Sequence, residues 1–328
     1  MRHLMWILAV ACGKPADTES PDSDTAVDTD DTDVEVLPPE ADFVPPEGAA
    51  KMNGTEGPWA RRILGATSED GLTWTKTGEI VSDQADVPSL IRDDKGWLYL
   101  YYYGWTVGDF ENVPAMAISV DNGQSWIFKY IGFEGFPGRG DVSDPDARFE
   151  DGTFRLWGST RPDDQTYLVT GEGNDGINFE FTSTAFQPEE GNAGVANVYQ
   201  VGDTWHLLSL ASLGFNNDVP AGTTWHATST DGTTFTSEET TEFRIDDVQY
   251  FHGNVIPVEG GFRLYVFTPG GHPMRSLFST DGENWEIEAG ARLTLDENSG
   301  LESGYVGDPD VVQLEDGTYF MAYATLIP

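Results

Sequence analysis

The chain has 328 residues, enough for one large core or two ordinary domains, and a formal net charge of −39 from 56 acidic and 17 basic residues. This charge repels phosphate backbones and anionic headgroups, so nucleic acid is excluded as a partner and polyanionic substrates are disfavoured. Its 37 glycines, 19 prolines and 12% aromatic content are typical of an all-β protein with many turns.

Residues 1–11 have the pattern of a secretory signal peptide. Arg2 gives a positive start, and the apolar run that follows is too short to span a bilayer. Cys12 is the only cysteine, so no disulfide can form within the chain. Residues 8–12, Leu-Ala-Val-Ala-Cys, resemble a bacterial lipobox, which implies lipidation of Cys12 and an anchor at the outer membrane or cell surface of a Gram-negative bacterium. The alternative is an ordinary signal peptide with an incidental cysteine.

Residues 12–50 are predicted to form a disordered acidic tether. The stretch is rich in Asp, Thr, Ser and Pro, and it has almost nothing apolar to bury. Its like charges repel one another, and it cannot offset the entropy lost on ordering. We therefore expect the lipid anchor to be the one membrane contact, and residues 51–328 to form the folded domain, as a monomer.

A turn motif of the form Ser-x-Asp-Gly-x-x-Trp, or a close variant, occurs five times after Trp59. Its aspartates are spaced by 50 to 56 residues, which is the size of a propeller blade; they are Asp70, Asp121, Asp175, Asp231 and Asp281. Asp and Gly favour a tight turn, the carboxylate accepts backbone N–H bonds, and the aromatic residue packs beneath. The five copies resemble the Asp-box (BNR) repeats of sialidases and related propellers, which implies a structural motif.

A second repeated element alternates with these turns: a polar start, a short strand, an acidic or glycine turn, and an aromatic-rich strand. The folded region begins with a turn-motif hairpin at residues 63–75 and ends with a strand pair at residues 308–324. Each is half a blade, and joining them closes a ring without open edges. The sequence therefore predicts an all-β fold, a five-bladed β-propeller closed by pairing of the N-terminal hairpin with the C-terminal strands.

The residues that open each second element are the candidate site. Innermost strands of a propeller begin near its axis, so these side chains should converge on one funnel. They are Asp86, Asp144, Asn197, His252, Asn254 and Asp308. Carboxyl and imidazole groups gathered from different blades suit binding or proton transfer; aspartates that only cap strand starts would be structural.

Three stretches, DPDVVQLEDGTYF, SDPDARFEDGTF and HGNVI, resemble five-bladed glycoside hydrolases such as family 43, with its arabinanases and β-xylosidases. The resemblance implies a general base at Asp308, a residue that tunes the acid's pKa at Asp144, and a central His252 that holds a metal or water. The Glu that serves as general acid in that family is absent from the strand with Asn197. Glu190, slightly upstream, and His252 are the substitutes to consider.

The remaining predictions concern the ligand. Asp86, Asn197 and Asn254 are predicted to bind the substrate, and Trp105 and Trp157 to stack on sugar rings at the rim. No cofactor is implied with certainty. A Ca²⁺ ion or a water at the axis is compatible with the sequence, but one histidine and distant carboxylates do not specify a metal.

The sequence leaves functions from different classes open. The first is a cell-surface glycoside hydrolase acting on neutral glycans, which the Asp-Pro and His-Gly motifs favour. The second is a non-catalytic propeller that binds a glycan or a protein, which the missing Glu favours. A third is a purely structural surface protein. A sialidase would need three convergent arginines and a Tyr–Glu nucleophile pair, and the arginines of this chain are scattered.

Overall fold

The structure, a computed structural model, describes residues 37–328 except residues 56, 138–141, 163 and 212–218. The predicted signal peptide, the predicted lipidation site Cys12 and most of the predicted tether lie outside the described residues. Within them, no helix is both long enough and apolar enough to cross a membrane.

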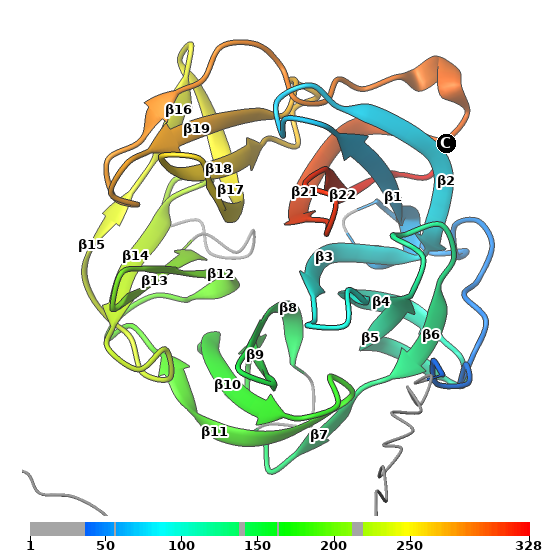
Figure 1. The fold of residues 1–328 in the computed structure, drawn as a ribbon, viewed down its shortest axis with the longest axis horizontal. Helices are drawn as coiled ribbons and strands as arrows, with labels where there is room; N and C mark the ends of the chain where they lie inside the picture. Colours follow the sequence, from blue (N-terminus) through cyan, green and yellow to red (C-terminus); the bar gives the residue numbers. More distant parts are fainter. Residues whose placement is uncertain (1–36, 56, 138–141, 163, 212–218) are drawn as a thin grey trace, which may run out of the picture. The chain divides into compact units, whose positions relative to one another are not determined.

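The described strands form five sheets, arranged as blades around an axis (Figure 1). From the axis outward, blade 1 contains β21 (Ser303–Gln313), β22 (Tyr319–Leu326), β1 (Arg61–Ser68) and β2 (Thr75–Asp83). Blade 2 contains β3 (Ala85–Arg92), β4 (Leu98–Val107), β5 (Phe110–Ser119) and β6 (Ile127–Tyr130). Blade 3 contains β8 (Ser143–Glu150), β9 (Thr153–Thr160), β10 (Tyr167–Gly173) and β11 (Asn178–Phe186), with β7 (Gly132–Glu134) parallel to β11.

Blades 4 and 5 complete the ring. Blade 4 contains β12 (Gly194–Val201), β13 (Thr204–Leu210), β14 (Thr224–Ser229) and β15 (Thr236–Thr241). Blade 5 contains β17 (Val248–Val258), β18 (Gly261–Phe267), β19 (Arg275–Ser279) and β20 (Glu286–Ile287), with β16 (Phe243–Ile245) paired to β17. Two short 3₁₀ turns, Pro58–Ala60 and Glu297–Ser299, lie outside the blades.

The predicted ring closure is confirmed. In blade 1, β22 pairs with β1 over the full length of both strands, from Arg61 opposite Leu326 to Ser68 opposite Tyr319. The two ends of the folded region therefore share one sheet, as the red and blue strands of Figure 1 show. This pairing removes the two edges that an open array would expose.

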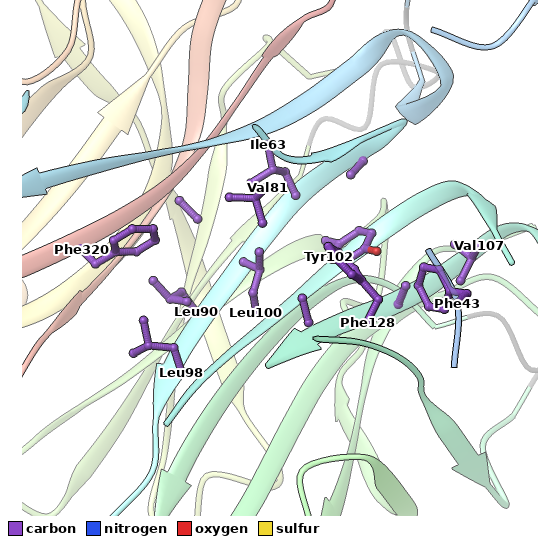
Figure 2. Close-up of a cluster of buried hydrophobic side chains, with 14 of the residues drawn as sticks. Phe43, Ile63, Val81, Leu90, Leu98, Leu100, Tyr102, Val107, Phe128 and Phe320 are labelled. Carbon is purple, nitrogen blue, oxygen red and sulfur yellow. The ribbon is translucent and has the colours of Figure 1, made fainter. Parts of the chain in front are cut away.

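The apolar core lies between neighbouring blades. The cluster in Figure 2 joins Ile63 of β1 and Phe320 of β22 to Leu100 of β4, all of them nearly or fully buried. Similar clusters fill the other blade boundaries. Because both faces of most strands are covered, the strands read as near-continuous apolar runs.

The five repeated turns have the local hydrogen bonds that the sequence predicts. In the first turn, Asp70 Oδ1 accepts from the N–H groups of Leu72 (2.8 Å) and Thr73 (2.7 Å). The turns also connect blades, because buried side chains of the preceding blade donate to the turn glycine's carbonyl. These bonds are Tyr101 Oη to Gly176, Trp157 Nε1 to Gly232, Tyr199 Oη to Gly282 and Tyr265 Oη to Gly71.

The boundary of the folded unit differs from the prediction. The unit begins at Pro38 rather than at residue 51. Phe43 packs against Phe128 with ring centroids 5.7 Å apart (Figure 2), and Asp42 pairs with Lys129 at 2.5 Å. An apolar ring, an ion pair and several hydrogen bonds therefore attach the end of the predicted tether to blade 2.

Candidate active site

The innermost strand of every blade opens with a bulge, which lies one residue later in blade 5 than in the other blades. The pairing register slips at this point in all five sheets. The triplets that occupy the bulges are Val87–Ser89, Asp144–Asp146, Val195–Asn197, His252–Asn254 and Asp308–Asp310. In four of them the first residue has a φ between 46° and 50°, a strained conformation for residues other than glycine.

The third residue of each triplet ties its blade to the next one. Asp146 Oδ2 accepts from Val198 N at 2.7 Å, and Asn197 Oδ1 accepts from Val255 N at 3.0 Å. Ser89, Asn254 and Asp310 make the equivalent bonds to Ala147, Val311 and Leu90. All five side chains are buried. Asn197 and Asn254 therefore bond to the neighbouring blade, and Asn197 also lines the small cavity near the axis, so their predicted substrate-binding role stays a prediction.

The first position of each triplet carries the predicted catalytic groups. Asp308, Asp144 and His252 stand there in blades 1, 3 and 5, whereas Val87 and Val195 stand there in blades 2 and 4. The position where the family resemblance implies a general-acid Glu is thus occupied by Val195. A cavity of about 30 Å³, room for about one water, lies between Asp308, Val195 and His252.

His252 of blade 5 contacts two residues of blade 4. Its Nε2 lies 3.0 Å from the Val195 carbonyl oxygen, and its Nδ1 lies 3.4 Å from Thr224 Oγ1. Burial lowers the pKa of the ring to about 4, so it is neutral at pH 7. Both ring nitrogens contact blade 4, and the predicted catalytic and metal-holding roles of His252 stay predictions. The described residues contain no group of three or more His, Cys, Asp or Glu side chains that could hold a metal.

Asp308 and Asp144 are the two partly exposed carboxyls of the candidate site, and the pKa of Asp308 is raised further than that of Asp144. Burial and the negative charge of Asp86 raise the pKa of Asp308 to about 8, and Asp144 adds to that rise. The Arg61 guanidinium opposes the shift without cancelling it. Asp308 therefore binds its proton more tightly than an ordinary aspartate.

Asp86 and Arg61 form an ion pair that links blades 1 and 2. Arg61, at the start of β1, donates through Nη1 to Asp86 Oδ2. The guanidinium also lies 5.5 Å from the centre of the Tyr305 ring. Burial raises the pKa of Asp86, and Arg61 opposes that rise. The site residue that the sequence did not identify is Arg61, whose only signal was its place at the start of the first strand.

Asp144 is the third carboxyl of the group. Burial and the charge of Asp86 raise its pKa to about 6. Ser143 Oγ donates to Asp144 Oδ2 at 3.2 Å, which holds the carboxyl in place and opposes the shift. The structure therefore brings Asp86, Asp144 and Asp308 into one electrostatic group that shares the Arg61 guanidinium.

The other predicted site residues have separate outcomes. Trp157 is fully buried, and the centre of its ring lies 6.0 Å from that of Trp205. The prediction that it stacks on a sugar at the rim is therefore wrong. Trp105 is partly exposed and packs edge-on against Trp59 at 5.3 Å, and its contact with a ligand stays a prediction. Glu190 is exposed in the loop between β11 and β12, and its role as acid also stays a prediction.

The raised pKa of Asp308 predicts that stability falls as pH rises. Between the ordinary value of 3.8 and about 8, the folded chain keeps a proton that the unfolded chain releases, so folding is favoured at the acid end of this range. Urea unfolding across this range should show a declining midpoint. Asp308→Asn should flatten the decline, and exposed Asp109→Asn should not. An unchanged slope in Asp308→Asn would contradict the assignment.

The molecule is a five-bladed β-propeller with three carboxyl groups gathered near its axis. No protein-family model matches the sequence, and no curated protein matches it. A solved structure of a thermostable family-43 glycoside hydrolase superposes with a TM-score of 0.58 and 14% identity, over 74% of this chain and 88% of that one.

Two further solved structures have the same fold. An α-L-arabinofuranosidase from Lactobacillus brevis gives a TM-score of 0.54 at 13% identity, over 71% of this chain and 80% of that one. A β-1,2-mannobiose phosphorylase from Listeria innocua, in complex with β-1,2-mannobiose, gives a TM-score of 0.54 at 12% identity, over 74% of this chain and 89% of that one. At these identities the likenesses show the fold, and the site has to be argued from its own residues.

Proposed function

We propose that this propeller is a glycoside hydrolase that acts on neutral glycans. The observation that carries the proposal is the convergence of Asp86, Asp144 and Asp308 from three blades, with the pKa of each carboxyl raised. Carboxyl groups with separated proton affinities are what glycoside hydrolysis requires of a protein. The solved neighbours that act on glycosides support the same reaction class.

The charge of the molecule supports a neutral substrate. The net charge is −39, and the candidate site adds three carboxyl groups to one guanidinium. A uronate or sialate would meet like charges both on approach and within the site. Neutral pentoses and hexoses meet no such repulsion.

The proposed setting is the cell surface. The lipobox-like residues 8–12 and the acidic stretch after them support export, lipidation at Cys12 and a spacer between membrane and propeller. The turn repeats, which resemble Asp boxes, support kinship with other propellers that act on glycans outside the cytoplasm.

A non-catalytic glycan-binding propeller is the second candidate. It is favoured by Val195, which occupies the first position of the blade 4 triplet, where the family resemblance implies the general acid. A binding protein would retain the funnel and lack the proton donor.

Reducing-sugar release from a panel of polysaccharides separates the two candidates. Neutral arabinan, xylan, galactan and mannan are compared with polygalacturonate and a sialylated glycan. A hydrolase for neutral glycans releases sugar from at least one neutral polymer and from neither anionic one. Retention on a polymer without any release favours the binding protein, and release from an anionic polymer alone contradicts the proposal.

A further inference from the structure

The missing acid poses a chemical problem that the funnel itself can solve. Hydrolysis of an unactivated glycoside needs a proton donor for the leaving oxygen, and the family-like position for it holds Val195. His252 has both ring nitrogens engaged, and Glu190 is exposed in a loop outside the triplets. The remaining candidates are the three carboxyl groups near the axis.

Those three carboxyls share one cation. Arg61 from β1 acts on Asp86 of β3, on Asp144 of β8 and on Asp308 of β21. Three negative charges in this little-exposed group, beside one guanidinium, repel one another, so the group retains a proton. The direct ion pair holds Arg61 against Asp86, which makes Asp86 the carboxylate and leaves the proton for one of the other two.

The surroundings of Asp308 favour it as the carrier of the proton. It faces the Asp86 carboxylate from β3, the Asp144 carboxyl from β8 and, on its own strand, the Tyr305 phenol. His252 of β17 lines the adjoining cavity as a neutral ring. Asp144 is further helped to ionise by hydrogen bonds from Ser143 and Ser159. The two carboxyls thus hold their protons with different strength.

The Asp86–Arg61 pair is specific to one blade boundary. The residue before the bulge triplet is Asp86 in blade 2, and in the other blades it is Ser143, Gly194, Phe251 or Gly307. Ring closure therefore does not require a carboxylate there. Asp86 Oδ1, Arg61 Nε and Tyr305 Oη also have no hydrogen-bond partner among the described residues, a cost that a purely structural pair would not explain.

We propose that Asp86, held as a carboxylate by Arg61, keeps Asp308 protonated, so that Asp308 is the general acid and Asp144 is the general base. This inference rests on the proposed hydrolase function and reverses the roles that the family resemblance implies. Asp86 is a positioning residue, because it acts through Asp308.

The reaction balances with these groups alone. Asp308 gives its proton to the glycosidic oxygen as the bond from that oxygen to the anomeric carbon breaks, and the leaving group departs as an alcohol. Asp144 takes a proton from the water whose oxygen bonds to the anomeric carbon. Asp308 is then a carboxylate and Asp144 an acid, and exchange of one proton through solvent restores both.

Leaving-group dependence distinguishes an acid from a base. The probes are the polysaccharide hydrolysed in the screen and the 2,4-dinitrophenyl glycoside of the sugar it releases, whose leaving group needs no proton. Asp308→Asn should lose about 10²- to 10⁴-fold on the polysaccharide and less than about tenfold on the dinitrophenyl glycoside. Asp144→Asn should lose activity on both. Equal loss on both probes in Asp308→Asn would overturn the assignment.

The pH profile on the polysaccharide tests the role of Asp86 directly. Activity of the full chain should be highest between about pH 6, where Asp144 ionises, and about pH 8, where Asp308 loses its proton. Asp86→Asn should move the alkaline limb down by about one pH unit or more. The matched control is Asp83→Asn, which breaks the buried Arg62–Asp83 pair and should leave that limb in place.

The outcomes separate two kinds of failure. An alkaline limb that stays in place in Asp86→Asn overturns the positioning role while the hydrolase function stands. A wild-type chain that hydrolyses no glycan contradicts the proposed function, and this inference with it.

Discussion

A chain that ends after Gln313 should not fold into a propeller, because it lacks the strand that joins the two ends of the ring. β22 lies between β21 and β1, and its Met321 and Tyr323 are buried. Its removal would expose the inner faces of β1 and β21 and leave both strands with an unpaired edge. Without the eight residue pairs between β22 and β1, blade 1 is two separate halves.

Thermal unfolding followed by circular dichroism measures this effect. The truncated chain should show no cooperative transition, whereas a chain shortened by Pro328 alone should melt like the wild type. A truncated chain that melts cooperatively within a few degrees of the full chain would show that the ring does not depend on its closure.

Asn254→Ala should destabilise the propeller by about 3 kcal/mol or more. Asn254 is buried and bridges blades 5 and 1: its Nδ2 donates to Asp310 Oδ1 at 3.0 Å, and its Oδ1 accepts from Val311 N at 3.2 Å. The alanine leaves a buried N–H and a buried carboxyl without their partner, and each orphan costs about 1 to 3 kcal/mol.

Urea unfolding of Asn254→Ala, beside Asn298→Ala as control, measures this cost. Asn298 is exposed in a 3₁₀ turn, so its loss should change the free energy of unfolding by less than about 0.5 kcal/mol. Equal values for the two variants would mean that the hydrogen bonds between blades do not stabilise the ring.

The blade architecture could be predicted because it repeats. Turn motifs such as Ser68–Trp74 recur at a nearly constant spacing, and half blades at both ends admit one closed arrangement. The start of the folded unit could not be predicted in the same way. Residues 38–50 have a tether-like composition, and Phe43 alone supplies the ring that packs on blade 2.

Part of the candidate site could be predicted. The position of a residue in the repeat indicates its blade and its strand, but not the side chains that surround it. The strand openings placed Asp86, Asp144 and Asp308 near the axis. They did not indicate that the third residue of each triplet, such as Asn197, bonds to the backbone of the next blade.

Long-range contacts account for the residues that the sequence did not identify. Arg61 reaches Asp86 only because β1 closes the ring beside β22, and that pairing joins the two ends of the folded region. Trp157 looked like a rim residue because it follows an inner strand. It is instead buried, where it donates to a turn carbonyl of the next blade.

Reducing-sugar release by the full chain and by Asp144→Asn, on the neutral polysaccharide panel, tests the central claim most directly. Asp109→Asn serves as the control for an aspartate that is exposed and outside the triplets. The account predicts release by the wild type and by Asp109→Asn, and a loss of at least about 10²-fold in folded Asp144→Asn. Release that persists undiminished in Asp144→Asn would contradict it, because the funnel carboxyls would then have no part in the chemistry.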